Sequence, residues 1–453
     1  MKTTIRHCFT GALLLSLFTP ENLYAQPEDH YGEGSLANAL AGETLNKWGI
    51  HVSGLLDVGY SRNNRSYHDE RRKGLSNLPI AGESDEGFEL RSVHLFIEKP
   101  IIGNFIPRIT PLPGPNPEQL SFGFSIEALY GRNAQFARTF GWDMHWEENS
   151  PGDDDSEAAK RNRQLFLAMP NVLATAYLPW GPGVTVWGGL FGPAIGNEIP
   201  PNPRQSRNLF ATKSYSFVTE PGTVFGLVAA LPIYKGDSGI ISVEGGPVRG
   251  INNMRDNNDV TSLIGAVRWR SPNMKTWLDY EFYSGAEQNA SFGDIQMPTA
   301  RLLSTRDQQR KQHAVTLWHE FDSLWNGSIE AVYGEQNGDG RIDTIDLVTG
   351  EAFNGAHWWG ANASISYRAT EKLTYSTRIE YFNDPQGYAL FPVSTARGAF
   401  NAITAGLRYD LNNFVSLRPE LRYDWQSATD DKAFGSARNQ SQFTSTFELL
   451  VYF

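Results

Sequence analysis

The sequence is nearly devoid of cysteine: of its 453 residues only Cys8 is one. Because Cys8 falls within a segment that we expect to be removed, the mature chain should contain neither disulfides nor a catalytic thiol. Basic residues are also scarce relative to acidic ones, 39 against 50, which gives a formal net charge of -11. Nucleic-acid-binding proteins carry basic surfaces, so we expect no nucleic acid among the partners.

Residues 1–25 have the pattern of a secretory signal. A positive start at Lys2 and Arg6 precedes an apolar core at 11–18 and a small-residue cleavage motif that ends at Ala25. A membrane anchor would need about twenty apolar residues, and this run is too short. We therefore expect the signal peptide to be cleaved.

After cleavage, residues 26–47 would form an N-terminal periplasmic segment. Within it, residues 35–45 could form a short helix capped by Ser35. The sequence does not decide whether this segment stays in the periplasm or enters the remaining domain at 48–453.

Long apolar runs are missing from the rest of the chain as well. Residues 165–197 carry no charge, but Pro170, Pro179, Pro182 and Pro193 would break a membrane-spanning helix there. The same stretch suits two strands joined by a turn. Without helices, a chain that crosses a membrane must form a closed barrel, because lipid leaves every unpaired backbone group unsatisfied.

Polar and apolar residues alternate along many segments, most clearly at 415–425. Odd positions there are mostly apolar, and the even positions are Ser416, Arg418, Glu420, Arg422 and Asp424. Segments 373–381 and 403–410 alternate in the same way. One face would meet lipid and the other water. A half-buried soluble sheet alternates too, so the number of segments decides.

Sixteen such segments can be identified, which is the even number expected of a bacterial barrel. They are 48–60, 86–99, 119–131, 165–178, 183–192, 222–232, 238–248, 261–270, 274–284, 311–321, 324–335, 356–368, 372–383, 399–410, 415–426 and 441–453. The predicted fold is all-β: a transmembrane antiparallel barrel of about 16 strands with long outer loops and short periplasmic turns. Two irregularities stand out, namely a long Pro-rich link at 100–118 on the short side and a phase slip near Ser92, which indicates a bulge or a misplaced strand start.

The last residues place Phe447, Leu449, Val451 and Phe453 on one strand face. This pattern resembles the C-terminal signature that the outer-membrane barrel assembly machinery recognises, with Phe453 as the terminal residue. The resemblance implies that this machinery is a partner.

The middle of the chain resembles the β-barrel porin family of the porin-2 type. The residues that carry the likeness are Gly188 to Phe191, Pro193 to Glu198, Asn208 to Phe210, Ser214 to Phe217 and Gly222 to Gly226. Family members often have a basic residue where this chain has Leu190. The resemblance implies a barrel and a porin more directly than a particular solute.

Together these features predict a channel in the outer membrane of a Gram-negative bacterium for passive diffusion of small hydrophilic solutes, with no cofactor. Outer-membrane lipids and lipopolysaccharide would be its surroundings, and a homo-oligomer is left open. Two alternatives also stay open: an outer-membrane barrel hydrolase, although no Gly-x-Ser-x-Gly motif occurs, and a plugged barrel that serves as a surface adhesion or scaffold protein.

One loop resembles a calcium-binding loop. Its oxygen ligands would be Glu335, Asn337, Asp339, Asp343 and Asp346. The first and last positions depart from the usual pattern, and strands rather than helices flank the loop. A polar hairpin loop explains the same residues, so we assign no metal.

The connector from 193 to 221 is the best candidate for a loop that folds inward and narrows the pore. It offers Arg204, Arg207 and Lys213 against Glu198 and Glu220. The facing wall would carry Arg378, Glu380, Arg408, Asp410, Arg418, Glu420, Arg422 and Asp424. A mixed ring of this kind would impose a transverse field on passing solutes. Ordinary ion pairs in a wide lumen are an equally good interpretation.

Overall fold

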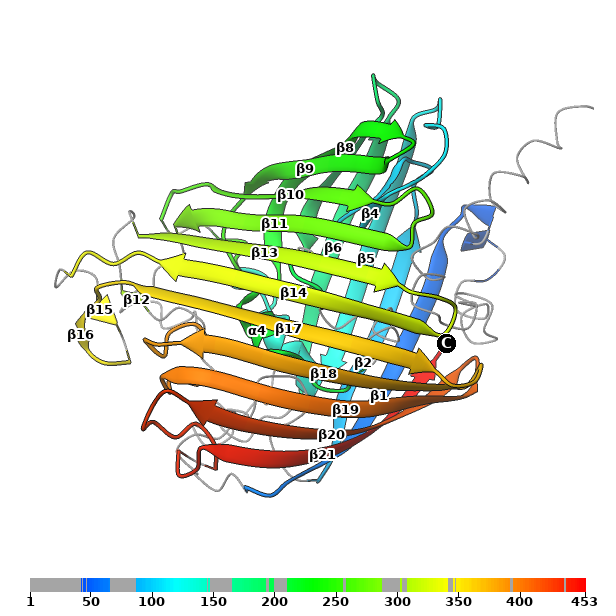
Figure 1. Ribbon diagram of the computed structural model, residues 1–453. Helices are drawn as coiled ribbons and strands as arrows, with labels where there is room; N and C mark the ends of the chain where they lie inside the picture. The colour runs from blue at the N-terminus through cyan, green and yellow to red at the C-terminus, as the bar shows by residue number, and fades with distance from the viewer. Residues whose placement is uncertain are drawn as a thin grey trace, which may run out of the picture.

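Sixteen antiparallel strands form one closed barrel in the computed structural model (Figure 1). The structure describes residues 42, 44–45, 47–65, 87–144, 146, 165–192, 195–198, 210–255, 258–286, 302–303, 308–340, 345–346, 348–391, 394–435 and 437–453. In their order around the barrel the strands are β1 (His51–Asn63), β2 (Gly87–Lys99), β5 (Ser121–Gly131), β6 (Phe166–Leu178), β7 (Val184–Phe191), β8 (Val224–Gly236), β9 (Gly239–Val248), β10 (Ser262–Arg270), β11 (Thr276–Ala286), β13 (Gln309–Glu320), β14 (Trp325–Gln336), β17 (Ala356–Arg368), β18 (Leu373–Asp384), β19 (Gly398–Asn412), β20 (Val415–Ser427) and β21 (Ser441–Tyr452).

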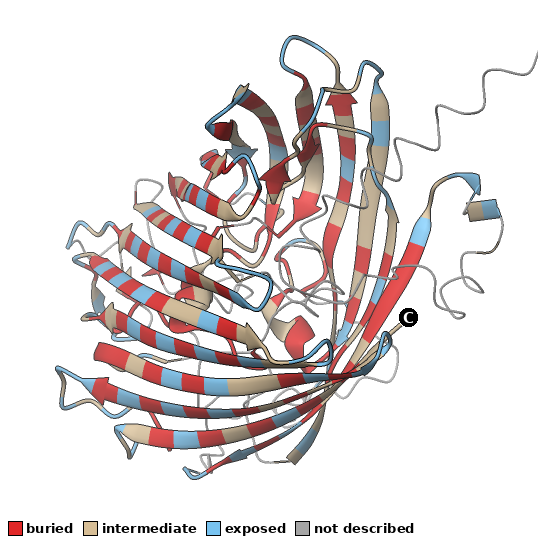
Figure 2. Cartoon of the chain, turned by 45° about the vertical axis from the view of Figure 1, so that its right-hand side comes forward, coloured by how far each residue is buried: buried red, intermediate tan, exposed pale blue. Residues whose placement is uncertain are grey.

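The predicted fold class is confirmed, and each expected segment corresponds to one barrel strand. The largest error in a strand limit is at the end of β8, which we expected at 232 and which extends to Gly236. Alternation explains the arrangement, because successive side chains of a strand point to opposite faces. Figure 2 shows the result as alternating buried and exposed bands along the strands. Exposed positions on these strands, such as Ile329 and Leu421, form an apolar outer surface.

Four pairs of neighbouring strands change register. In β1 and β2 the shift lies between Asp57 and Val58, whose partners are Ser92 and Leu90, so Arg91 is the extra residue. The phase slip near Ser92 is thus a bulge. The other shifts, at 127/129, 232/234 and 410/412, were not predicted.

The connectors alternate in length. Turns such as 237–238 and 413–414 join strands at one end, and long connectors such as 249–261 and 385–397 join them at the other. By the bacterial pattern, the short turns are periplasmic. The exception is the link from 100 to 120, which contains a small hairpin of β3 (Phe105–Ile106) and β4 (Thr110–Pro111).

Short elements occur within the long connectors. Strands β12 (Leu302–Leu303), β15 (Ile345–Asp346) and β16 (Glu351–Ala352) form a separate small sheet. The 3-10 helix η3 (Arg132–Phe136) follows β5, and helix α4 (Tyr215–Thr219) precedes β8. No helix among the described residues is long and apolar enough to cross a membrane. The expected signal peptide and Ser35 lie outside the described residues.

The barrel interior is polar over most of its wall and apolar over one part. Trp187 and Phe191 on β7 and Val224 and Val228 on β8 point inward and are buried. Phe105 of the β3–β4 hairpin packs into the same cluster. The inner wall elsewhere carries further buried aromatic side chains, such as Trp358 and Phe382, together with many buried ionisable ones, and the ionisable side chains form the candidate site.

Candidate functional site

Two described parts of the connector between β7 and β8, residues 195–198 and 210–221, lie against the inner wall; we call them the inward segment. The wall holds this segment by its backbone. Gly196 N donates to Glu281 Oε2 at 2.7 Å, and Ala211 N donates to Glu420 Oε2 at 2.7 Å. Because charge-assisted hydrogen bonds to backbone N–H groups are strong, wall carboxylates fix where the segment sits.

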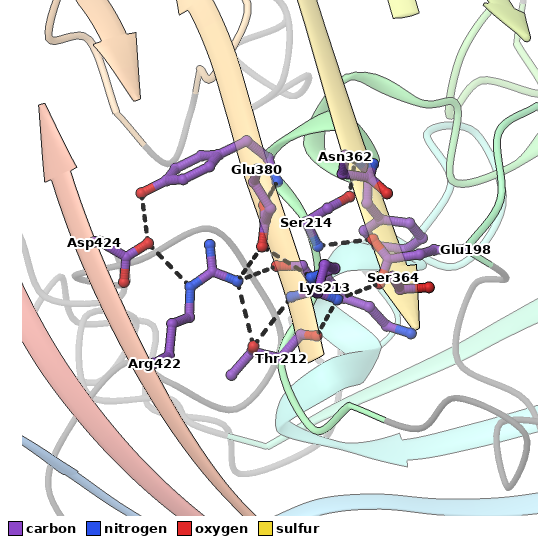
Figure 3. A network of polar contacts seen from close by, with 12 residues as sticks. Glu198, Thr212, Lys213, Ser214, Asn362, Ser364, Glu380, Arg422 and Asp424 are labelled. Carbon is purple, nitrogen blue, oxygen red and sulfur yellow. Dashed lines mark hydrogen bonds and ion pairs between the residues drawn. The ribbon is translucent and has the colours of Figure 1, made fainter. Parts of the chain in front are cut away.

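A continuous network of charges surrounds the start of helix α4 (Figure 3). Arg378 Nε and Arg422 Nη1 both donate to Glu380 Oε1 at 2.9 Å, and Arg422 Nε donates to Asp424 Oδ1 at 2.9 Å. Tyr215 joins the network twice, through its N to Glu380 Oε2 at 2.9 Å and its hydroxyl to Asp424 Oδ1 at 2.8 Å. Strands β18 and β20 therefore clamp the inward segment.

Thr212 and Glu198 extend this network. Arg378 Nη1 donates to Glu198 Oε1 at 3.1 Å and to the Thr212 carbonyl at 3.0 Å. The Thr212 hydroxyl donates to Glu420 Oε1 at 2.5 Å. Glu198 also accepts from Ser214 N at 2.7 Å. The two described parts of the segment are thereby tied to each other as well as to the wall.

Lys213 differs from the other cations of the site. Its side chain is 2 % exposed, and among the described residues its ammonium has no hydrogen-bond acceptor. The group lies 5.3 Å from the centre of the Phe217 ring. Burial lowers the pKa of Lys213 to about 8; Glu198 opposes this change, and Arg418 and Arg378 add to it. A buried cation without a carboxylate partner is costly.

Four carboxylates lie close together around Glu220 of the inward segment. Glu220 lies near Glu198, Glu281 and Glu330, and burial, reinforced by these negative neighbours, raises the pKa of Glu220 well above its usual value. Asn197 N donates to Glu330 Oε1 at 2.7 Å. Within the described ranges, no three acidic, histidine or cysteine side chains are placed to hold a metal ion.

The structure brings some of the predicted site residues together and separates others. Glu198, Lys213, Arg378, Glu380, Glu420, Arg422 and Asp424 belong to the network described above. Arg408 instead pairs with Asp410 at 2.7 Å, and Arg418 pairs with Glu448 on β21 at 2.5 Å. Arg204 and Arg207 lie outside the described residues.

Sequence reasoning missed a second charged cluster. Arg268 on β10 bonds Glu244 at 2.7 Å, Asp279 at 2.8 Å and Glu281 at 2.7 Å, and Arg270 bonds Asp279 at 2.5 Å. Alternation within 261–270 and 274–284 would have placed all of these except Glu244 on the inner face. Glu244 could have been found in the same way from 238–248. The network also depends on the strand register, which alternation alone does not fix.

The calcium-like loop is described only in part, and its first and last candidate ligands, Glu335 and Asp346, make other contacts. Glu335 accepts a hydrogen bond from Lys311 Nζ at 2.8 Å on β13. Asp346 lies in β15, where its Oδ1 accepts from Val348 N at 2.9 Å. Asp343 lies outside the described residues. Gly340 has a left-handed backbone conformation, with a φ of 67°.

Histidines provide little support for hydrolytic chemistry. His94 Nδ1 lies 2.9 Å from Glu127 Oε1 inside the barrel, and Glu127 is bonded in turn to Asn171. His319 Nδ1 contacts the Thr276 hydroxyl at 2.8 Å. His313 Nδ1 contacts the Tyr280 hydroxyl at 2.9 Å. Among the described residues, no histidine is hydrogen-bonded to both a hydroxyl and a carboxylate, the arrangement that activates a nucleophile.

Comparisons with known proteins found one family model and several solved outer-membrane proteins. A family model described as "Putative beta-barrel porin-2, OmpL-like" matches residues 49–453. The anion-selective porin of Comamonas acidovorans is 10 % identical, with a TM-score of 0.50 over 89 % of this chain and 99 % of that chain. The outer membrane channel DcaP of Acinetobacter baumannii is 10 % identical (TM-score 0.49, 90 % and 98 % covered), as is OprB of Pseudomonas putida (TM-score 0.49, 91 % and 97 %). At sequence identities this low, the likeness shows a shared fold and nothing about function. No curated protein matches the chain.

Proposed function

Because the chain belongs to the porin-2, OmpL-like family of β-barrel porins, and so resides in the outer membrane of a Gram-negative bacterium, we propose that it is a channel for passive diffusion of small hydrophilic solutes. Sixteen strands are enough to enclose an aqueous channel. The observation that carries the proposal is the inward segment, which lies inside the barrel against a charged wall rather than over its rim.

The charges would act on solutes through a transverse field. Arg378 and Arg422 meet Glu380 and Asp424 on one wall, and Lys213 adds a cation from the inward segment. Fixed charges of both signs at a narrow point orient polar solutes and set the ion preference of a pore. Arg204 and Arg207 belong to the same connector, and we propose that they contribute positive charge to this constriction.

Planar bilayer recordings test the channel directly. The purified protein should insert with stepwise current increases in potassium chloride. Failure to conduct across a range of salt concentrations, with the barrel still folded by its heat-dependent gel mobility, would contradict the proposal and favour a plugged barrel with an adhesion or scaffold role. Turnover of lipid or peptidoglycan fragments by the same preparation would favour the hydrolase instead.

Selectivity tests the constriction. Changing Arg204 and Arg207 together to Glu should shift the reversal potential in a salt gradient towards cations and alter the single-channel conductance. An unchanged reversal potential in an inserted barrel would place the constriction elsewhere. Arg397→Glu is the control, because Arg397 is exposed and belongs to another connector, between β18 and β19, where it pairs with Asp431.

The remaining partners are proposals from the outer surface and the C-terminus. Exposed apolar side chains such as Leu317 and Ile365 suit contact with outer-membrane lipids and lipopolysaccharide. We also propose that the barrel assembly machinery recognises Phe453. We further propose that the protein forms homo-oligomers.

A further inference from the structure

The β3–β4 hairpin enters the barrel from the periplasmic end. Its base is fixed to the turn before β7, where Asn104 Nδ2 donates to the Pro182 carbonyl at 2.9 Å and to the Gly183 carbonyl at 3.0 Å. Phe105, 1 % exposed, stacks on Trp187 with ring centres 6.3 Å apart. The hairpin therefore lies along the apolar inner face of β7 and covers it.

Arg108, at the tip of the hairpin, reaches the opposite end of the same strand. Its Nη1 donates to Asn171 Oδ1 at 3.0 Å and to the Gly192 carbonyl at 2.6 Å. Gly192 follows Phe191, the last residue of β7, and begins the connector that contains the inward segment. Two chain segments that enter the barrel from opposite ends thus meet at Arg108.

The backbone of Arg108 is unusual. Its φ is 68°, a left-handed conformation that costs energy for any residue other than glycine. Such conformations persist where surrounding contacts over-determine them, and they are enriched at functional positions. Here the hydrogen bonds of the side chain and the neighbouring carbonyls supply those contacts.

A second bridge joins the hairpin to the inward segment through the wall. Arg268 Nη2 donates to the Arg108 carbonyl at 3.3 Å, and Arg268 Nη1 donates to Glu281 Oε1 at 2.7 Å. The other oxygen of Glu281 accepts from Gly196 N at 2.7 Å. Arg270 fixes the start of the returning strand, because its Nε donates to the Thr110 hydroxyl at 2.9 Å and its Nη2 to the carbonyl of the preceding Ile109 at 2.8 Å.

We propose that Arg108 is a positioning residue that sets where the inward segment lies, so that the periplasmic hairpin and the outer connector together define the constriction. The tip residues 106–109 are partly exposed, whereas Asn104, Phe105 and Thr110 are buried. The hairpin is therefore packed on the wall at its base and faces the barrel interior at its tip. This proposal rests on the channel function for its effect on solutes, but not for its effect on the inward segment.

Amide hydrogen exchange of the full-length protein tests the positioning role without any conduction. Arg108→Gly keeps the backbone conformation accessible and removes the guanidinium. We expect faster exchange at Gly196 and Asn197 in this variant. Arg108→Lys retains one positive donor group without the planar fork and should give an intermediate rate. Lys235→Gln is the control, because Lys235 holds the same periplasmic link at Gly114 and Asn116 but does not touch the hairpin tip.

Bilayer recordings of the same variants supply the second measurement. Arg108→Gly should increase open-channel noise and conductance and shift the reversal potential, with Arg108→Lys between it and the wild type. Unchanged exchange at Gly196 and Asn197 in both Arg108 variants would overturn the proposal even if conductance changed, since the loss of one lumenal charge could do that alone. A wild type that does not conduct would contradict the channel function and leave the exchange result to decide this proposal separately. If Arg108→Gly does not fold, the Arg108→Lys variant decides alone: amide exchange at Gly196 and Asn197 at the wild-type rate would overturn the proposal.

Discussion

Arg422 on β20 donates from Nη1 to Glu380 Oε1 on β18 at 2.9 Å, although strand β19 lies between the two. The register explains how they meet. Ala402 on β19 pairs with Glu380 on one side and Asp424 on the other, and Thr404 pairs with Arg378 and Arg422. Because Ala402 and Thr404 are small, the longer side chains of β18 and β20 can reach across β19 and contact each other.

Glu380→Gln should weaken this clamp. The amide keeps the shape but removes the negative charge between Arg378 and Arg422, and losing one partner of a buried ion pair typically costs about 3–5 kcal/mol. We expect a lower midpoint of heat-induced unfolding and a reversal potential shifted towards anions. Glu351→Gln, an exposed change in β16, should do neither. If Glu380→Gln has the wild-type unfolding midpoint and reversal potential, the charge of Glu380 stabilises neither the barrel nor the position of the inward segment.

Lys213 predicts a pH dependence of stability. The pKa of an unfolded lysine is 10.5, and burial lowers that of Lys213 to about 8. Between these pH values the folded chain holds a neutral Lys213 and the unfolded chain a charged one, so folding releases a proton and rising pH favours the folded state. Below pH 8 the penalty is constant, at most about 3 kcal/mol.

We therefore expect the unfolding midpoint to rise between pH 8 and pH 10.5 by more in the wild type than in Lys213→Met. At pH 7 the methionine variant should be the more stable of the two, because it never carries the buried charge. Parallel pH profiles for the two proteins would contradict the burial of the ammonium.

Ile329 and Ile102 test which exposed surface meets lipid. Ile329, 56 % exposed, lies near the middle of β14, and Ile102, 62 % exposed, lies in the periplasmic link. Arginine near the bilayer midplane of a barrel costs about 2–4 kcal/mol, and near the interface about 0–1 kcal/mol. In lipid vesicles, the free energy of unfolding should fall by more in Ile329→Arg than in Ile102→Arg. Equal losses would mean that the membrane does not cover this part of β14.

Gly54 and Phe453 test the closure of the barrel. A Cβ added to Gly54 would lie 2.1 Å from the Phe453 ring, so the two cannot coexist without a shift. We expect Gly54→Val to destabilise the barrel by about 1–3 kcal/mol, the usual cost of overpacking. Gly245→Val, where the nearest atom to an added Cβ is 3.3 Å away, should cost less. If the two variants unfold alike, the ring does not pack on Gly54 in the membrane.

Alternation was sufficient to predict the sixteen strands and the inward orientation of side chains such as Arg422 and Glu380, because both follow from a period of two residues along a strand. It could not predict which charges pair. Arg418 bonds Glu448 because β20 and β21 are adjacent in a register that places these residues opposite each other. Register depends on contacts between strands, and one strand's pattern does not contain it.

The β3–β4 hairpin was visible in the sequence only as an unusually long, Pro-rich link. Strands of two residues show no periodicity, and nothing in the sequence marks Arg108 as a residue with positive φ. Its conformation arises from partners on β6 and β10 and from Gly192, just after β7, all of which are distant in the chain.

The seam between β1 and β21 has a consequence for the order in which the molecule forms. Gly54 N donates to the Phe453 carbonyl at 2.7 Å, and Phe453 N donates to the Gly54 carbonyl at 3.0 Å, so Phe453 extends the pairing between β1 and β21. Until β21 and Phe453 pair with it, β1 presents an unpaired edge, which is a template for pairing with other chains. Contacts between such distant residues also form slowly. The barrel therefore closes only when β1 and β21, which are far apart in the chain, have met, and until then both strands expose edges that are open to pairing with other chains.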